Sequence, residues 1–103
     1  MTDTEFTTIT GLRQTIVRLS REIDQALQAA PTTTDPTVRL NITVIDAMRR
    51  CGIGLANLTG KLLSDRLASP DGSYSCTIDK LKKAIEEMEY TKQKALDLKE
   101  SPP

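Results

Sequence analysis

The chain of 103 residues contains no histidine and no tryptophan, and its aromatic residues are limited to Phe6, Tyr74 and Tyr90. Without histidine, the chain can form neither a serine–histidine catalytic pair nor a histidine-ligated metal site. With aromatics at only 3% of the residues, a core has to be built from leucine, isoleucine, valine and alanine. That composition favours helices over a sheet, because strands are enriched in aromatic residues.

Cysteine is also scarce, with only Cys51 and Cys76, and the two do not form a CxxC motif. Two thiolates alone do not make a structural zinc site. On a continuous helix, Cys51 would lie about 24 Å from the helix end that precedes Cys76. A disulfide needs Cα atoms within ~7 Å of each other. We therefore expect two free thiols that act in packing.

The chain also lacks an excess of charge of either sign, since its 14 cationic and 14 anionic side chains cancel. This argues against nucleic acid and anionic membranes as partners, because both attract clustered positive charge. The segment 1–5 lacks the basic start and apolar run of a signal peptide, and no window approaches the ~20 apolar residues of a membrane span. We expect a cytoplasmic protein.

Catalytic motifs are absent from the sequence. The Gly52-Ile53-Gly54 stretch lacks the third glycine and preceding strand of a dinucleotide-binding loop, and no phosphate-loop lysine motif occurs. The carboxylates Glu86, Glu87 and Glu89 fall on one charged helical face, as expected for a solvated surface. We predict no enzymatic activity, no cofactor, no metal and no small-molecule substrate.

Periodic apolar residues predict three long helices over residues 3–30, 36–68 and 75–100, followed by a disordered tail at 101–103. Thr2 and Glu5 have the spacing of a capping box, and Asp35-Pro36 is a typical helix start. The intervening turns are short. The predicted fold is all-α, an up-down-up antiparallel three-helix bundle forming a single domain.

The helix at 36–68 is the most apolar of the three. One series alternates by four and three residues, as in a coiled-coil seam: Val44, Met48, Cys51, Leu55, Leu58 and Leu62. A second series flanks it, and together they cover an arc of about 220°, about twice the width found on the outer helices. We therefore predict that this central helix is the most buried.

The two halves of this arc have different expected roles. The half centred on Leu55, Leu58 and Leu62 can be matched within the chain. The other half is either covered by the outer helices or exposed as an interface for another protein or a second copy: Ile42, Ile45, Arg49, Gly52, Ile53, Ala56, Gly60 and Leu63.

Small residues make this second half a smooth groove, because Gly52, Ala56, Gly60 and Ser64 recur every four residues. Glycine within a helix costs about 1 kcal/mol relative to alanine, so a closely packed helix is expected there. Tyr90 lies roughly opposite the apolar stripe of the third helix and is a candidate exposed anchor.

The function predicted from these features is a non-catalytic protein-interaction module, such as a small inhibitor, an immunity-type protein, a chaperone or an adaptor, that uses the wide apolar face of the central helix. An alternative divides residues 45–67 into a helix-turn-helix with glycine at the turn, which would bind DNA. Two features argue against it. The four- and three-residue spacing of the apolar seam continues unchanged across Gly52–Gly54, as in an unbroken helix. The second helix would also carry Asp65 and few cations.

Overall fold

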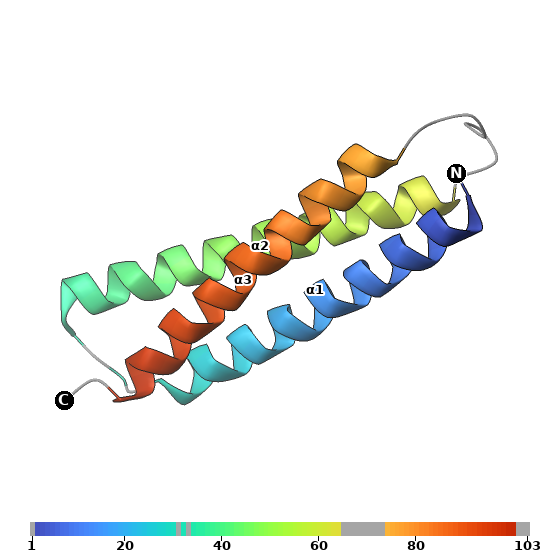
Figure 1. Cartoon of the computed structure of the whole chain (residues 1–103). Coiled ribbons are helices and arrows are strands. Elements are labelled where there is room, and N and C mark those ends of the chain that lie inside the picture. The colour runs from blue at the N-terminus through green and yellow to red at the C-terminus, as the bar shows by residue number, and fades with distance from the viewer. Residues whose placement is uncertain (1, 31, 33, 65–73, 101–103) are drawn as a thin grey trace.

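Three helices account for the architecture: α1 (Asp3–Ala29), α2 (Pro36–Ser64) and α3 (Ser75–Glu100). The computed structural model describes residues 2–30, 32, 34–64 and 74–100. The helices run up, down and up, and all three pack against one another in a rod of 55 × 17 × 17 Å (Figure 1). The predicted three-helix bundle is confirmed. The expected end of the second helix at residue 68 and the tail at 101–103 lie outside the described residues.

Local hydrogen bonds explain where α1 and α2 begin. The Thr2 hydroxyl accepts from the Glu5 N–H at 3.1 Å, and the Glu5 carboxylate accepts from the Thr2 N–H at 2.9 Å, which completes the predicted capping box. The Asp35 carboxylate accepts from the Thr37 N–H at 2.8 Å. These acceptors satisfy backbone donors that have no partner within the helix.

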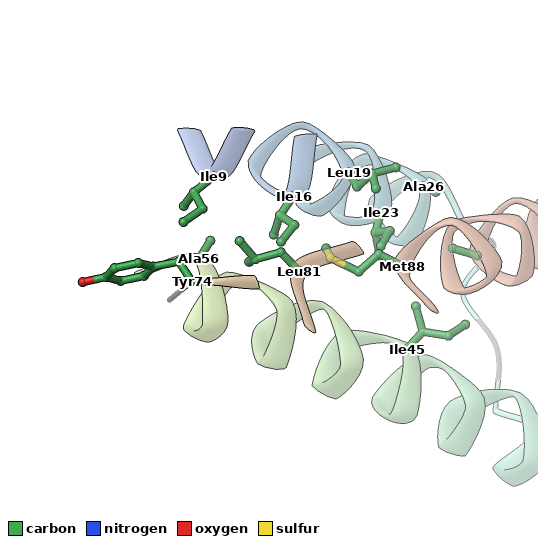
Figure 2. Close-up of a cluster of buried hydrophobic side chains, with 11 residues drawn as sticks. Ile9, Ile16, Leu19, Ile23, Ala26, Ile45, Ala56, Tyr74, Leu81 and Met88 are labelled. Atoms are coloured by element: carbon green, nitrogen blue, oxygen red, sulfur yellow. The ribbon is translucent and has the colours of Figure 1, made fainter. Parts of the chain in front are cut away.

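The core is formed mainly by α1 and α3, the two helices that pack most extensively against each other. The face of α1 that carries Ile9, Ile16 and Ile23 points inward, where it meets Leu81 and Met88 of α3 (Figure 2). The buried hydrophobic residues are Ile9, Ile16, Leu19, Ile23, Ala26, Ile45, Ala56, Tyr74, Leu81, Met88 and Ala95. Aliphatic residues therefore build the core, as the composition requires.

The prediction that the central helix is the most buried is wrong. Among its described hydrophobic side chains, only Ile45 and Ala56 are buried, whereas Leu40 is 63%, Val44 52% and Leu58 62% exposed. Two neighbouring helices cannot cover an apolar arc of about 220°. The apolar side chains of α2 that the two neighbouring helices do not cover remain on the surface.

The prediction that the half of α2 centred on Leu55, Leu58 and Leu62 packs inside the chain is wrong for Leu58, which is 62% exposed, and Leu55 is half-buried. The side carrying Gly52 and Ala56 faces inward, and the side carrying Val44 and Leu58 faces outward. A Cβ atom on Gly52 would collide with the Met88 sulfur of α3. The small residues let α2 lie close to the other two helices, because the distance between helix axes depends on the size of the side chains at the contact.

Candidate functional site

The surface predicted on α2 lies largely inside the bundle. Ile45, Gly52 and Ala56 are buried, and the remaining members on α2 are half-buried: Ile42, Arg49, Ile53, Gly60 and Leu63. The structure thus realises the other arrangement that the sequence allowed, in which the outer helices cover this face. These buried atoms are not available to a partner of the folded monomer.

Two arginines are part of this internal contact. Arg49 donates to Asp46 Oδ1 at 2.9 and 3.0 Å and to the Ser20 hydroxyl of α1 at 3.5 Å. Its charge is thereby compensated within the chain. Arg13 of α1 donates to the Ala56 carbonyl at 2.8 Å, with its guanidinium against Gly60. Sequence reasoning missed Arg13, because its partner is a backbone carbonyl 43 residues away.

The exposed apolar surface of α2 follows the heptad series instead. We call this strip the outer seam, and the structure describes it over Leu40, Val44, Met48, Cys51, Leu55 and Leu58. Leu55 is half-buried, and the other five side chains are exposed. Cys51 and Cys76 are free thiols, as predicted, but both are exposed, so the packing role expected for them is not observed.

A shallow groove separates the outer seam from α3. It consists of three adjoining hollows of about 360, 330 and 280 Å³ between α2 and α3. On the α2 side the lining is mainly apolar, and on the α3 side charged residues and Tyr90 line it. The lining of this α2–α3 groove includes Val44, Met48, Cys51, Leu55, Lys80, Lys83, Glu86, Glu87, Tyr90, Lys94 and Asp97.

Tyr90 is the one predicted site residue that the structure leaves exposed, at 65%. It lies on α3 at the middle hollow, where Val44 and Met48 of α2 form the opposite wall. The Lys94 ammonium lies 4.9 Å from the centre of the Tyr90 ring, a distance typical of a cation–π contact. An aromatic residue is thus held beside the exposed apolar strip.

Charge is distributed unevenly around the groove. Over 36–64, α2 carries four cations, at Arg39, Arg49, Arg50 and Lys61, and one carboxylate, at Asp46. Arg50 is 74% exposed, although its Nε lies 2.9 Å from Asp46 Oδ2. The α3 wall alternates lysines with carboxylates.

The carboxyl groups with shifted pKa values support the fold and lie away from this groove. Hydrogen bonds from the backbone N–H groups of Thr2 and Tyr74 lower the pKa of Glu5. The Lys92 ammonium, 2.6 Å from Glu22 Oε2, lowers the pKa of Glu22 despite the opposing effect of burial. These two carboxylates connect α1 to the start and to the C-terminal third of α3.

The described residues contain neither a metal-ligand cluster nor a membrane-spanning helix. Within 2–30, 32, 34–64 and 74–100, no three histidine, cysteine, aspartate or glutamate side chains are grouped as metal ligands would be. In that same part of the chain, no helix combines the length and the apolar character needed to cross a membrane.

The helix-turn-helix alternative requires a turn at Gly52–Gly54. Instead, α2 is a single helix from Pro36 to Ser64. Among the glycines that the structure describes, none has a positive φ angle. The proposed recognition helix therefore does not exist as a separate element.

Comparison with known proteins adds no relative, since no family model matches the chain and no curated protein or solved structure is significantly similar to it.

Proposed function

We propose that this protein is a non-catalytic interaction module whose outer seam on α2 packs against another polypeptide chain. The observation that carries the proposal is the exposure of the outer seam, where Leu40, Val44 and Leu58 are each more than half exposed on a single helix. Contiguous exposed apolar strips of this kind commonly mark protein interaction sites.

The geometry of the strip favours a helix as the bound element. The outer seam has helical spacing, and the α2–α3 groove runs beside it through three adjoining hollows. An amphipathic helix placed there would bury the strip and complete a four-helix arrangement. Tyr90 at the groove is the aromatic side chain best placed to anchor it.

Val17 provides a matched control for testing this surface. Val17 on α1 is 40% exposed and Val44 on the outer seam is 52% exposed, so the same substitution can be made on two faces of one molecule. Because both side chains are exposed, Val17→Glu and Val44→Glu should retain helical circular dichroism and a similar melting temperature.

The three forms are immobilised and the proteins that each retains are compared. We expect wild-type protein and Val17→Glu to retain the same binding proteins in similar amounts. Val44→Glu should retain at least tenfold smaller amounts of them. A buried carboxylate in an apolar interface costs several kcal/mol, which corresponds to a large loss of affinity. Equal retention by all three forms would contradict the proposal. So would equal loss by Val17→Glu and Val44→Glu.

A cytoplasmic location forms part of the proposal. Two exposed free thiols, Cys51 and Cys76, are compatible with a reducing compartment, whereas exposed thiols in oxidising compartments commonly pair. The measurement is the thiol state in intact cells that are lysed under acid quench. If both thiols can be labelled, the result supports this location. If they are recovered in oxidised form, the result contradicts it.

A further inference from the structure

A shallow hollow on α1, away from the α2–α3 groove, is lined by arginine side chains. Its volume is about 270 Å³, and its lining residues are Arg13, Gln14, Val17, Arg18 and Arg21. Among the described residues that line it there is no carboxylate, whereas each of the three hollows of the α2–α3 groove includes at least one. The local charge is therefore positive, in a chain whose net charge is zero.

Arg13 brings to this hollow a positive charge that no carboxylate of the described residues compensates. Its side chain is half-buried, and a charge that is partly removed from water is unfavourable without a counter-charge. Its Nε donates to the Ala56 carbonyl at 2.8 Å, and its guanidinium lies against Gly60. A guanidinium has five N–H donors, so an anion in the hollow can accept from the others. The contacts with α2 already hold the group in place, which reduces the entropy lost on binding.

Arg18 and Arg21 add two further charges that are incompletely compensated. Arg18 Nη1 lies 3.5 Å from Glu22 Oε1, while the Lys92 ammonium lies 2.6 Å from the other oxygen of the same carboxylate. One negative charge is thus shared by two cations. The Arg21 side chain is exposed, and it makes no hydrogen bond or ion pair with any residue that the structure describes. The hollow as a whole keeps an excess of positive charge.

We propose that this hollow, which we call the arginine hollow, binds a compact oligophosphate, that is, a molecule in which two or more phosphate groups are linked. Guanidinium groups bind phosphate oxygens through paired N–H···O bonds. All three cations of the arginine hollow are arginines, whereas the cations of α3 over Ser75–Glu100 are all lysines. The inference goes beyond the proposed function and does not depend on the outer seam.

Size and charge together favour linked phosphates over carboxylates. The volume of about 270 Å³ lies just below the ~300–1,000 Å³ of typical ligand pockets, so the ligand has to be small. A phosphate group carries about −1.5 to −2 charges at pH 7 and offers three acceptor oxygens. Two linked phosphates can therefore compensate three guanidinium groups within this volume. A carboxylate carries one charge, so the same match would take three carboxylates and a larger molecule.

Calorimetric titration of the full chain with sodium tripolyphosphate, against sodium chloride at equal ionic strength, tests the proposal. We expect saturable binding to the wild type. Arg21→Gln should raise the dissociation constant by about tenfold or more, because it removes one of three guanidinium groups. Arg39→Gln is the matched control, since Arg39 is exposed on α2 and does not line the arginine hollow. It makes the same change in net charge and should leave the dissociation constant within about twofold of the wild type.

The two valine variants separate this site from the outer seam. Val17→Glu introduces a carboxylate among the arginines and should abolish tripolyphosphate binding, whereas Val44→Glu should leave it unchanged. The protein-retention experiment expects the opposite order, with loss for Val44→Glu and retention for Val17→Glu. Failure of one proposal is therefore distinguishable from failure of the other.

Adenosine triphosphate, titrated in parallel, distinguishes two sources of the phosphate chain. A dissociation constant equal to that of tripolyphosphate would support recognition of the phosphates alone. Tighter binding of the nucleotide would support the same site with additional contacts to the nucleoside. Binding of the nucleotide without binding of tripolyphosphate would contradict the inference, because the phosphate chain would not be the recognised group.

Three further outcomes would overturn the inference. Absence of saturable binding at millimolar tripolyphosphate would exclude the ligand class. Equal weakening by Arg21→Gln and Arg39→Gln would indicate a general attraction between charges and no defined site. Binding that Val17→Glu leaves unchanged would place the ligand outside the arginine hollow.

Discussion

Gly52 shows how one residue sets the distance between two helices. Its missing side chain leaves room for the Met88 thioether, whose Cε lies 2.9 Å from the position a Cβ atom would take. Met88 itself is only 2% exposed, so it cannot turn out to solvent. A helical glycine lowers helix propensity, and here that cost is offset by close packing.

Replacing Gly52 with leucine should therefore destabilise the protein. We expect Gly52→Leu to lower the free energy of unfolding by about 1–3 kcal/mol, because added side-chain volume forces core side chains out of their preferred rotamers. Urea denaturation followed by circular dichroism measures the change.

Gly11 on α1 is the matched control, since a Cβ atom there would meet nothing within 4 Å. Gly11→Leu should leave stability unchanged or raise it by up to about 1 kcal/mol through helix propensity. If both variants were equally stable, the contact between Gly52 and Met88 would not limit the packing of α2 against α3.

At the scale of the element, the start of α1 is connected to the start of α3. Glu5 Oε1 accepts from the Thr2 N–H at 2.9 Å, and Glu5 Oε2 accepts from the Tyr74 N–H at 3.1 Å. Tyr74 is buried, and its carbonyl accepts the Ile78 N–H of the first turn of α3 at 2.9 Å. One capping carboxylate thus satisfies backbone donors at the ends of two helices.

Removing the cap hydroxyl should weaken this end of the bundle. We expect Thr2→Ala to lower the free energy of unfolding by about 1 kcal/mol, the usual cost of losing a helix cap. Thr4→Ala, at an exposed position inside the first turn, is the control and should not destabilise. Hydrogen exchange should locate the Thr2→Ala effect at the first turn of α1, and protection equal to wild type there would contradict it.

At the scale of the whole molecule, α1 and α3 form the main packed pair, and an ion pair joins them in the C-terminal third of both helices. Glu22 Oε2 is a buried atom 2.6 Å from the Lys92 ammonium, and Arg18 lies 3.5 Å from the other carboxylate oxygen. A carboxylate so placed stabilises the fold only while it is ionised.

The bundle should consequently lose stability in acid. The folded-state pKa values of Glu5 and Glu22 are both below the ordinary value of 4.5, so their contribution is complete above pH 4.5 and is lost as the pH falls through the folded-state values. We expect the urea midpoint to fall between pH 5 and pH 3. Glu22→Gln should reduce that pH dependence, and the exposed control Glu89→Gln should not. A midpoint that stayed constant from pH 5 to pH 3 would contradict the role of these carboxylates.

The sequence by itself determined the elements of this protein. The capping box at Thr2 and Glu5, the start at Asp35-Pro36 and the stripe through Ile9, Ile16 and Ile23 are local signals, and α1 and α2 begin where these signals place them. The seam of α1 is unambiguous, because it is narrow and has polar residues on both sides. Such signals involve residues a few positions apart, so no tertiary information is needed to recognise them.

Only the tertiary structure decided which half of the apolar arc of α2 is covered. Both halves are apolar, so periodicity alone cannot rank them. The choice depends on partners distant in the chain, namely Met88 against Gly52 and Arg13 against the Ala56 carbonyl. These contacts turn the glycine side inward, because small residues let three helices approach closely. The same rotation leaves the heptad series of Val44, Met48 and Leu58 on the surface, where it forms the candidate site.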